Sequence, residues 1–139
     1  MFCLLAMFLL GGSTACAQTD VRTVDGFRLS VIDNGRSRVA AELRRREDGY
    51  WLEGVVRRKP LVRGPMTGHI QIEVLGAEGA MVTAMDVPFE PARIPSGTRP
   101  QARFAARLAE PLPPGAVIIV RHCGDQGVRR FRETPAGAR

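Results

Sequence analysis

The stretch Gln101–Leu108, QARFAARL, decides the fold class of this chain because its side chains alternate without interruption. The apolar side chains share one face and the arginines share the other: Ala102, Phe104, Ala106 and Leu108 against Arg103 and Arg107. A period of two residues is typical of a strand with one buried and one solvated face. The alternation therefore predicts a half-buried β-strand.

The residues after this stretch add turns and strands. Pro111–Gly115 contains three prolines and a glycine, which excludes a continuing helix. The β-branched run Ala116–Val120 predicts a strand buried on both faces. Gly124–Gly127 predicts a turn, and Val128–Arg132 predicts a last, arginine-rich edge strand.

The residues before it predict a hairpin. His69–Leu75 alternates between apolar and polar side chains, and Met81–Val87 follows after the short connection Gly76–Gly79. Pro88–Pro100 holds four prolines, which indicates an extended connection.

The first half of the chain predicts three further strands. Asp33–Gly35 is a turn signal between Phe27–Ile32 and Ser37–Arg44, and Tyr50–Val56 follows another turn at Asp48-Gly49. The segment Ser37–Glu47 fits either a helical stripe or an alternating strand, and the turns on both sides favour the strand.

Seven or eight short strands with Gly or Pro between them indicate a sandwich. We therefore expect an all-β chain: a single antiparallel β-sandwich of about seven strands over residues 18–134, with 135–139 as a flexible tail.

A family pattern supports this fold. Trp51–Val56 (WLEGVV), then Ile70–Leu75 (IQIEVL) with Gly79, then Phe104, resemble small bacterial immunoglobulin-like domains of the FxLYD type. In that family a G-x-V strand precedes an alternating strand, a D-x-x-G hairpin and a Phe-bearing strand. Gly76 stands here where such domains usually carry Asp or another polar turn residue. The resemblance implies an immunoglobulin-like sandwich that serves as an adhesion or scaffold module, with no catalytic residues to carry over.

The N-terminus has the layout of a secretory signal peptide. An apolar run, Phe2–Leu10, precedes the small-residue patch Gly11–Thr14 and the A-x-A site Ala15–Ala17. The run is too short to cross a bilayer, whose hydrocarbon core is about 30 Å thick. We expect residues 1–17 to be removed and the protein to work in the periplasm or elsewhere outside the cytoplasm.

Cys16 leaves a second route open. Ser13–Cys16 resembles the lipobox of bacterial lipoproteins, in which the cysteine is acylated and becomes the first residue of the mature chain. The signal would then be residues 1–15, and the lack of Asp at position 17 implies an outer-membrane lipoprotein. Membrane attachment would come only through that lipid anchor.

Net charge and sequence motifs narrow the functions that this chain can have. The chain carries 20 Lys and Arg against 14 Asp and Glu, a formal net charge of +6, and all of these residues lie after the signal segment. This excess favours anionic neighbours. His122-Cys123 with Asp125 is the one catalytic candidate, but adjacent strand residues point to opposite faces. Since no catalytic motif appears, we expect no enzyme.

Two sets of residues are candidate binding sites. Thioether, imidazole and thiolate groups suit Cu(I), which makes copper handling the alternative function, with these candidate ligands: Met66, His69, Met81, Met85 and His122. Two basic clusters flank the strand that holds Tyr50 and Trp51, and on a hairpin they would converge into a patch for an anionic surface: Arg44, Arg45, Arg46 and Arg57, Arg58, Lys59.

Together these features predict a non-catalytic interaction or accessory module with a protein partner in the cell envelope. No nucleic-acid motif accompanies the basic clusters, so we expect no nucleic-acid partner. No cofactor is expected unless the copper alternative holds.

Overall fold

The computed structural model describes residues 19–96, 101–108 and 111–124. The expected signal peptide, Cys16, the expected strand Val128–Arg132 and the tail 135–139 lie outside the described residues. Within the described part there is no helix, and so none long and apolar enough to span a membrane.

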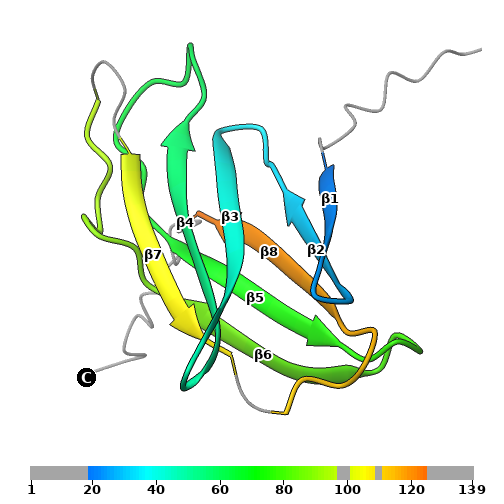
Figure 1. The fold of residues 1–139 in the computed structure, drawn as a ribbon. Helices are drawn as coiled ribbons and strands as arrows, with labels where there is room; N and C mark the ends of the chain where they lie inside the picture. The colour runs from blue at the N-terminus through cyan, green and yellow to red at the C-terminus, as the bar shows by residue number, and fades with distance from the viewer. Residues whose placement is uncertain (1–18, 97–100, 109–110, 125–139) are drawn as a thin grey trace, which may run out of the picture.

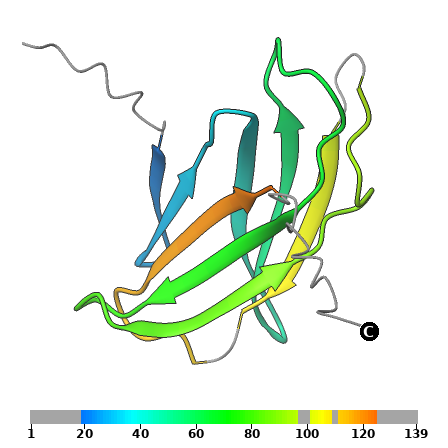
Figure 2. The ribbon, with the colours of Figure 1, turned by 180° about the vertical axis from the view of Figure 1, so that it is seen from behind.

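Eight strands make up the described fold (Figure 1): β1 Thr19–Val24, β2 Phe27–Ile32, β3 Ser37–Arg46, β4 Gly49–Arg58, β5 His69–Leu75, β6 Met81–Val87, β7 Gln101–Arg107 and β8 Val117–Cys123. They form a five-stranded sheet in the order β1-β2-β8-β5-β6 and a three-stranded sheet in the order β3-β4-β7. Figures 1 and 2 view the molecule from opposite sides and show the two sheets facing each other. The prediction of an all-β sandwich is confirmed.

The core lies between the sheets because each inner face is apolar. On β7 burial alternates along the whole strand, with Ala102, Phe104 and Ala106 buried between exposed neighbours. Ile70, Ile72 and Val74 of β5 alternate in the same way. Each Val, Leu, Ile or Phe side chain buried here stabilises the fold by roughly 1.5–3 kcal/mol relative to leaving it exposed.

One strand pair departs from the predicted antiparallel arrangement. β2 and β8 run parallel, with Leu29 opposite Ile118, whereas β8 and β5 are antiparallel. A hairpin imposes antiparallel pairing only on strands adjacent in sequence. Since β2 and β8 are joined through the other sheet, nothing local sets their relative direction.

The structure adds one strand and corrects one expectation. β1 was not predicted; it forms a tight hairpin with β2 through Asp25 and Gly26, both at positive φ (50° and 81°). The strand after Pro114 is not buried on both faces, since Ile118, Val120 and His122 are buried and the residues between them are half-buried. β8 therefore has an inner and an outer face like its neighbours.

Two backbone bridges tie the long connections to the sandwich. Met66, in the loop between β4 and β5, exchanges N–H···O=C bonds of 2.9 and 2.8 Å with Ile94. Glu90 exchanges two bonds of 2.8 Å with Arg103, so the chain at Glu90 extends the three-stranded sheet beyond β7.

Candidate functional site

The outer face of the three-stranded sheet carries most of its charge in ordered rows. Strand register places outward-facing residues side by side, two residues apart along each strand. Successive rows are Arg38–Arg57–Gln101, Ala40–Val55–Arg103, Glu42–Glu53–Ala105 and Arg44–Trp51–Arg107, and Arg46 follows on β3. We call this surface the arginine face; it holds six arginines and two glutamates.

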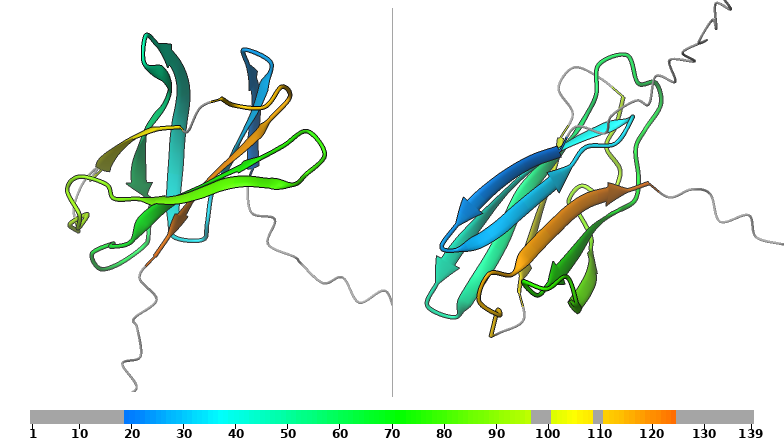
Figure 3. Two further views of the ribbon diagram at one scale, coloured as in Figure 1. Left: turned by 90° about the horizontal axis from the view of Figure 1, so that it is seen from below. Right: turned by 90° about the vertical axis from the view of Figure 1, so that its right-hand side faces the viewer.

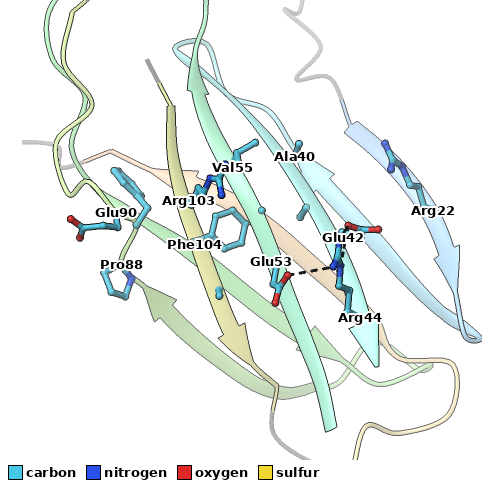
Figure 4. A pocket seen from close by; sticks show the side chains of 14 residues that line it. Arg22, Ala40, Glu42, Arg44, Glu53, Val55, Pro88, Glu90, Arg103 and Phe104 are labelled. Atoms are coloured by element: carbon cyan, nitrogen blue, oxygen red, sulfur yellow. Dashed lines mark hydrogen bonds and ion pairs between the residues drawn. The ribbon is translucent and has the colours of Figure 1, made fainter. Parts of the chain in front are cut away.

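A groove of about 910 Å³ crosses the arginine face. Its floor is low because Ala40, Val55 and Ala105 are small. Figure 4 shows Pro88 and Glu90 beyond β7 at one side of the groove and Arg22 of β1 at the other. The groove thus crosses the middle rows of the arginine face, from the segment at Glu90 to β1, and a chain lying along β4 would pass over it.

Gly54 and Phe104 shape the sheet beneath this groove. A Cβ on Gly54 would lie 2.6 Å from the ring of Phe104 and 2.1 Å from the backbone oxygen of Ala40. The missing side chain lets the phenyl ring of Phe104 lie across β4, and that ring is buried. Glycine in a strand often marks such a close approach.

The two glutamates form ion pairs with arginines, whereas several arginines have no carboxylate partner among the described residues. Glu42 accepts from Arg44 at 2.8 Å, and Glu53 pairs with Arg46 and, at 3.9 Å, with Arg44. The hydrogen bond and charge of Glu42 raise the pKa of Arg44. Within the described residues no carboxylate forms an ion pair with these arginines: Arg38, Arg57 and Arg103.

Trp51 supplies an aromatic surface at the hairpin end of the arginine face. Its indole Nε1 donates to the carboxylate of Asp48 at 3.0 Å, and the guanidinium of Arg46 lies 5.0 Å from the ring centroid. The hydrogen bond from Trp51 holds the pKa of Asp48 below its ordinary value, and the charges of Arg107 and Arg46 act in the same direction. Trp51 is the only tryptophan in the chain, so its fluorescence reports on this face alone.

The two predicted basic clusters do not converge. In the β3–β4 hairpin Arg45 lies opposite Tyr50, beside the turn, whereas Arg57 lies opposite Arg38 at the open end. Seven residues separate Tyr50 from Arg57, which is about 23 Å at 3.3 Å per residue. Clusters before and after a hairpin turn meet only when both lie equally far from it.

The six candidate basic residues lie in different places in the fold. Arg44, Arg46 and Arg57 lie on the arginine face, and Arg45 falls on the opposite face of β3. Arg58 donates to the carbonyl oxygens of Ile94 and Pro95, and Lys59 begins the loop after β4. The arginines that complete the face, Arg38, Arg103 and Arg107, were not among the candidates; the alternation of Arg103 and Arg107 with buried residues was the available signal.

The structure distributes the candidate copper ligands over several places. His69 lies near Asp86 at 3.4 Å, on the face of the sheet opposite to His122. Met81 is exposed, Met85 packs against the core, and buried Met66 shares a cavity of about 420 Å³ with His122. No group of three or more His, Cys, Asp or Glu in the described part of the chain is placed to hold a metal ion. The copper hypothesis stays a prediction.

His122 is the centre of a buried polar network. Its Nε2–H donates to the carbonyl oxygen of Thr67 at 3.1 Å, because a carbonyl can only accept. Its Nδ1 lies 2.8 Å from Oγ of Ser37 and 3.3 Å from Nδ2 of Asn34. Asn34 Oδ1 in turn accepts from the backbone N–H groups of Arg36 and Ser37, both at 2.8 Å.

This network braces loops and does not present a nucleophile. Ser37 is fully buried, and the Nε2 of His122 is occupied by Thr67. Cys123 lies on the other face of β8, where its thiol approaches Oε1 of Gln71 at 3.7 Å, as the strand alternation predicts for adjacent residues. Asp125 lies outside the described residues.

Comparisons of the chain with protein-family models, with curated proteins and with solved structures found no match. The resemblance to FxLYD-type domains therefore stays a prediction, and function has to be argued from the arginine face itself.

Proposed function

We propose that this protein is a non-catalytic interaction module of the cell envelope and that the arginine face binds an acidic, extended segment of a partner protein. The observation that carries the proposal is a set of arginines with no carboxylate partner among the described residues, Arg38, Arg57 and Arg103, beside a groove with a low floor; Arg57 donates only to the amide oxygen of Gln101 at 3.2 Å. Unpaired guanidinium groups form strong bidentate hydrogen bonds with carboxylates.

The spacing of the rows suits an extended chain. Rows recur every two residues along β4, which is about 6.6 Å, and side chains on one face of an extended peptide recur at the same interval. The basic row at Arg57 and the row at Trp51 are six residues apart, or about 20 Å. A segment of about seven extended residues would reach from one to the other.

The charge pattern of the arginine face determines where acidic residues can lie in the partner segment. The row of Glu42 and Glu53 lies between arginine-bearing rows, so a carboxylate bound there would meet like charges. A partner segment therefore needs its acidic side chains near its ends and small side chains in the middle. This central acidic row disfavours a flat anionic membrane as the ligand.

A direct test uses two synthetic seven-residue peptides of equal composition, one with glutamates at both ends and one with the same glutamates in the middle. Binding is followed by Trp51 fluorescence and by calorimetry. We expect the first peptide to bind more tightly, and its affinity to fall steeply with salt, because exposed charges are screened within about 10 Å at 0.1 M.

Matched variants locate the binding. Arg57→Gln with Arg103→Gln should weaken the first peptide at least about tenfold, since each charge-assisted hydrogen bond contributes roughly 1.5–3 kcal/mol. Arg28→Gln with Arg93→Gln removes the same charge from exposed positions outside the face. Equal losses in both double variants, or equal binding of the two peptides, would overturn the proposal.

A further inference from the structure

Leu61 is the most exposed large apolar side chain in the described part of the chain. It lies in the loop between β4 and β5, and its relative exposure is 100%. Its φ of 72° belongs to the left-handed region, which disfavours a residue with a Cβ. The loop therefore holds a leucine in water, in a conformation that glycine adopts more readily.

The loop that carries Leu61 is braced at its base. The backbone N–H of Lys59 donates to the carbonyl of Arg36 at 2.9 Å, and the N–H of Val62 closes a turn on Lys59 at 3.3 Å. On the far side, Met66 is buried and bridged to Ile94. Leu61 is thus presented by a fixed turn between two anchored ends.

Basic residues lie close to this leucine in the chain. Lys59 and Arg63 flank it in sequence, and Arg36 approaches the carbonyl of Arg63 at 3.5 Å through Nη2. The sequence 57–69 contains no acidic residue. An exposed apolar side chain in a basic loop matches the boundary between acyl chains and anionic headgroups, where lysine and arginine each add about 1 kcal/mol of attraction.

The start of the described chain lies at the same end of the molecule. Thr19 pairs with Ile32, which leads into the loop 33–36 that contacts Lys59. Figures 1 and 3 show the beginning of β1, the β2–β3 connection and the β4–β5 loop at one end of the sandwich. Cys16 precedes Thr19 by three residues, so an acyl chain on it would be attached within about 10 Å of Thr19.

We propose that this end of the protein docks on an anionic phospholipid bilayer, with Leu61 inserted at the headgroup boundary and Arg36, Lys59 and Arg63 contacting lipid phosphates. This contact uses no residue of the arginine face; the Arg57 row of that face lies at the same end of β4, and the Trp51 row lies at the far end. One acyl chain gives only marginal membrane binding, so a basic, apolar loop beside it would serve as the second attachment.

The test measures sedimentation of the chain from Gln18 to Arg139, which keeps every described strand, with vesicles of mixed phosphatidylglycerol and phosphatidylcholine. Leu61→Ser should lower the partition coefficient about tenfold, and Lys59→Gln with Arg63→Gln should lower it at least as much. Val82→Ser removes another exposed apolar side chain, from β6, and should leave the partition coefficient unchanged. Vesicles of pure phosphatidylcholine should bind weakly.

A second readout distinguishes insertion from surface attraction. In the Cys123→Ser background, Leu61→Cys labelled with an environment-sensitive dye should shift to the blue on mixed vesicles, whereas labelled Val82→Cys should not. An unshifted dye at position 61, or wild-type partition of Leu61→Ser, overturns the proposal. If Arg57→Gln with Arg103→Gln abolishes partition while Leu61→Ser does not, the arginine face is the membrane site and both proposals fail. If Arg57→Gln with Arg103→Gln loses peptide binding but keeps vesicle partition, the peptide site and the membrane site are separate, as proposed.

Discussion

The hydroxyl oxygen of Ser37 lies 2.8 Å from Nδ1 of His122, across 85 positions of sequence. Ser37 begins the three-stranded sheet, and His122 lies near the end of the central strand of the other sheet. Together with Asn34 and Thr67, the pair joins the β2–β3 connection, β8 and the β4–β5 loop. This network stabilises the end of the sandwich at which Leu61 is presented.

Ser37→Ala should therefore destabilise the protein by about 1–3 kcal/mol, because it removes a buried partner from His122 and Asn34. The free energy of unfolding in urea measures the effect. Ser30→Ala, at a half-buried position of β2, serves as the control and should change it by less than about 0.5 kcal/mol. Equal stability of the two variants would show that the network contributes nothing.

Gly54→Ala should cost roughly 2 kcal/mol or more, because the new Cβ meets the backbone oxygen of Ala40 as well as the ring of Phe104. Gly35→Ala is the matched control: nothing lies within 4 Å of its Cβ position, and its φ is not in the left-handed region. That substitution should be neutral or stabilise by about 0.4–1 kcal/mol. Similar unfolding midpoints for both variants would contradict the tight contact.

Leu61→Gly should raise the free energy of unfolding by about 0.5–1 kcal/mol, since glycine adopts the observed φ of 72° without a Cβ penalty. No burial is lost, because the side chain is fully exposed. Val62→Gly in the same turn should lower stability instead. A stabilised but membrane-deficient Leu61→Gly variant would show that the leucine is retained for binding; a destabilised one would mean that it packs in solution.

Trp51 fluorescence should report the protonation of Asp48. Because its folded pKa is depressed, Asp48 contributes stability at pH values above its unfolded pKa, and this contribution is lost as the pH falls through the folded pKa. The emission should therefore stay constant down to about pH 4 and change below it. Asp48→Asn should remove that transition; an unchanged acid transition would assign it to global unfolding.

Local patterns were enough to predict most strands. The alternation of Gln101–Leu108 and the paired runs around Gly76–Gly79 became β7 and the β5–β6 hairpin, because side-chain period and turn chemistry are encoded within a few residues. β1 was missed because its residues are exposed or half-buried and show no alternation. Its signal was Asp25-Gly26, a tight-hairpin dipeptide.

Half of the arginines on the arginine face could also be predicted from the sequence. The sequence showed clusters at Arg44–Arg46 and Arg57–Lys59, but their positions relative to the hairpin turn place them at opposite ends of β4. Arg38 and Arg103 joined the site only through lateral pairing of β3 and β7 with β4. Which strands become neighbours depends on packing of the whole core, and no window of sequence contains that information.

The sequence by itself determined that this chain forms strands, where most of them turn, and that its charge excess is basic. The tertiary structure decided that β2 and β8 run parallel, that Ser37 meets His122, and that arginines from three strands line one groove. The physical reason is range: alternation and turn preference act between neighbours, whereas these contacts exist only after two sheets have buried their apolar faces against each other.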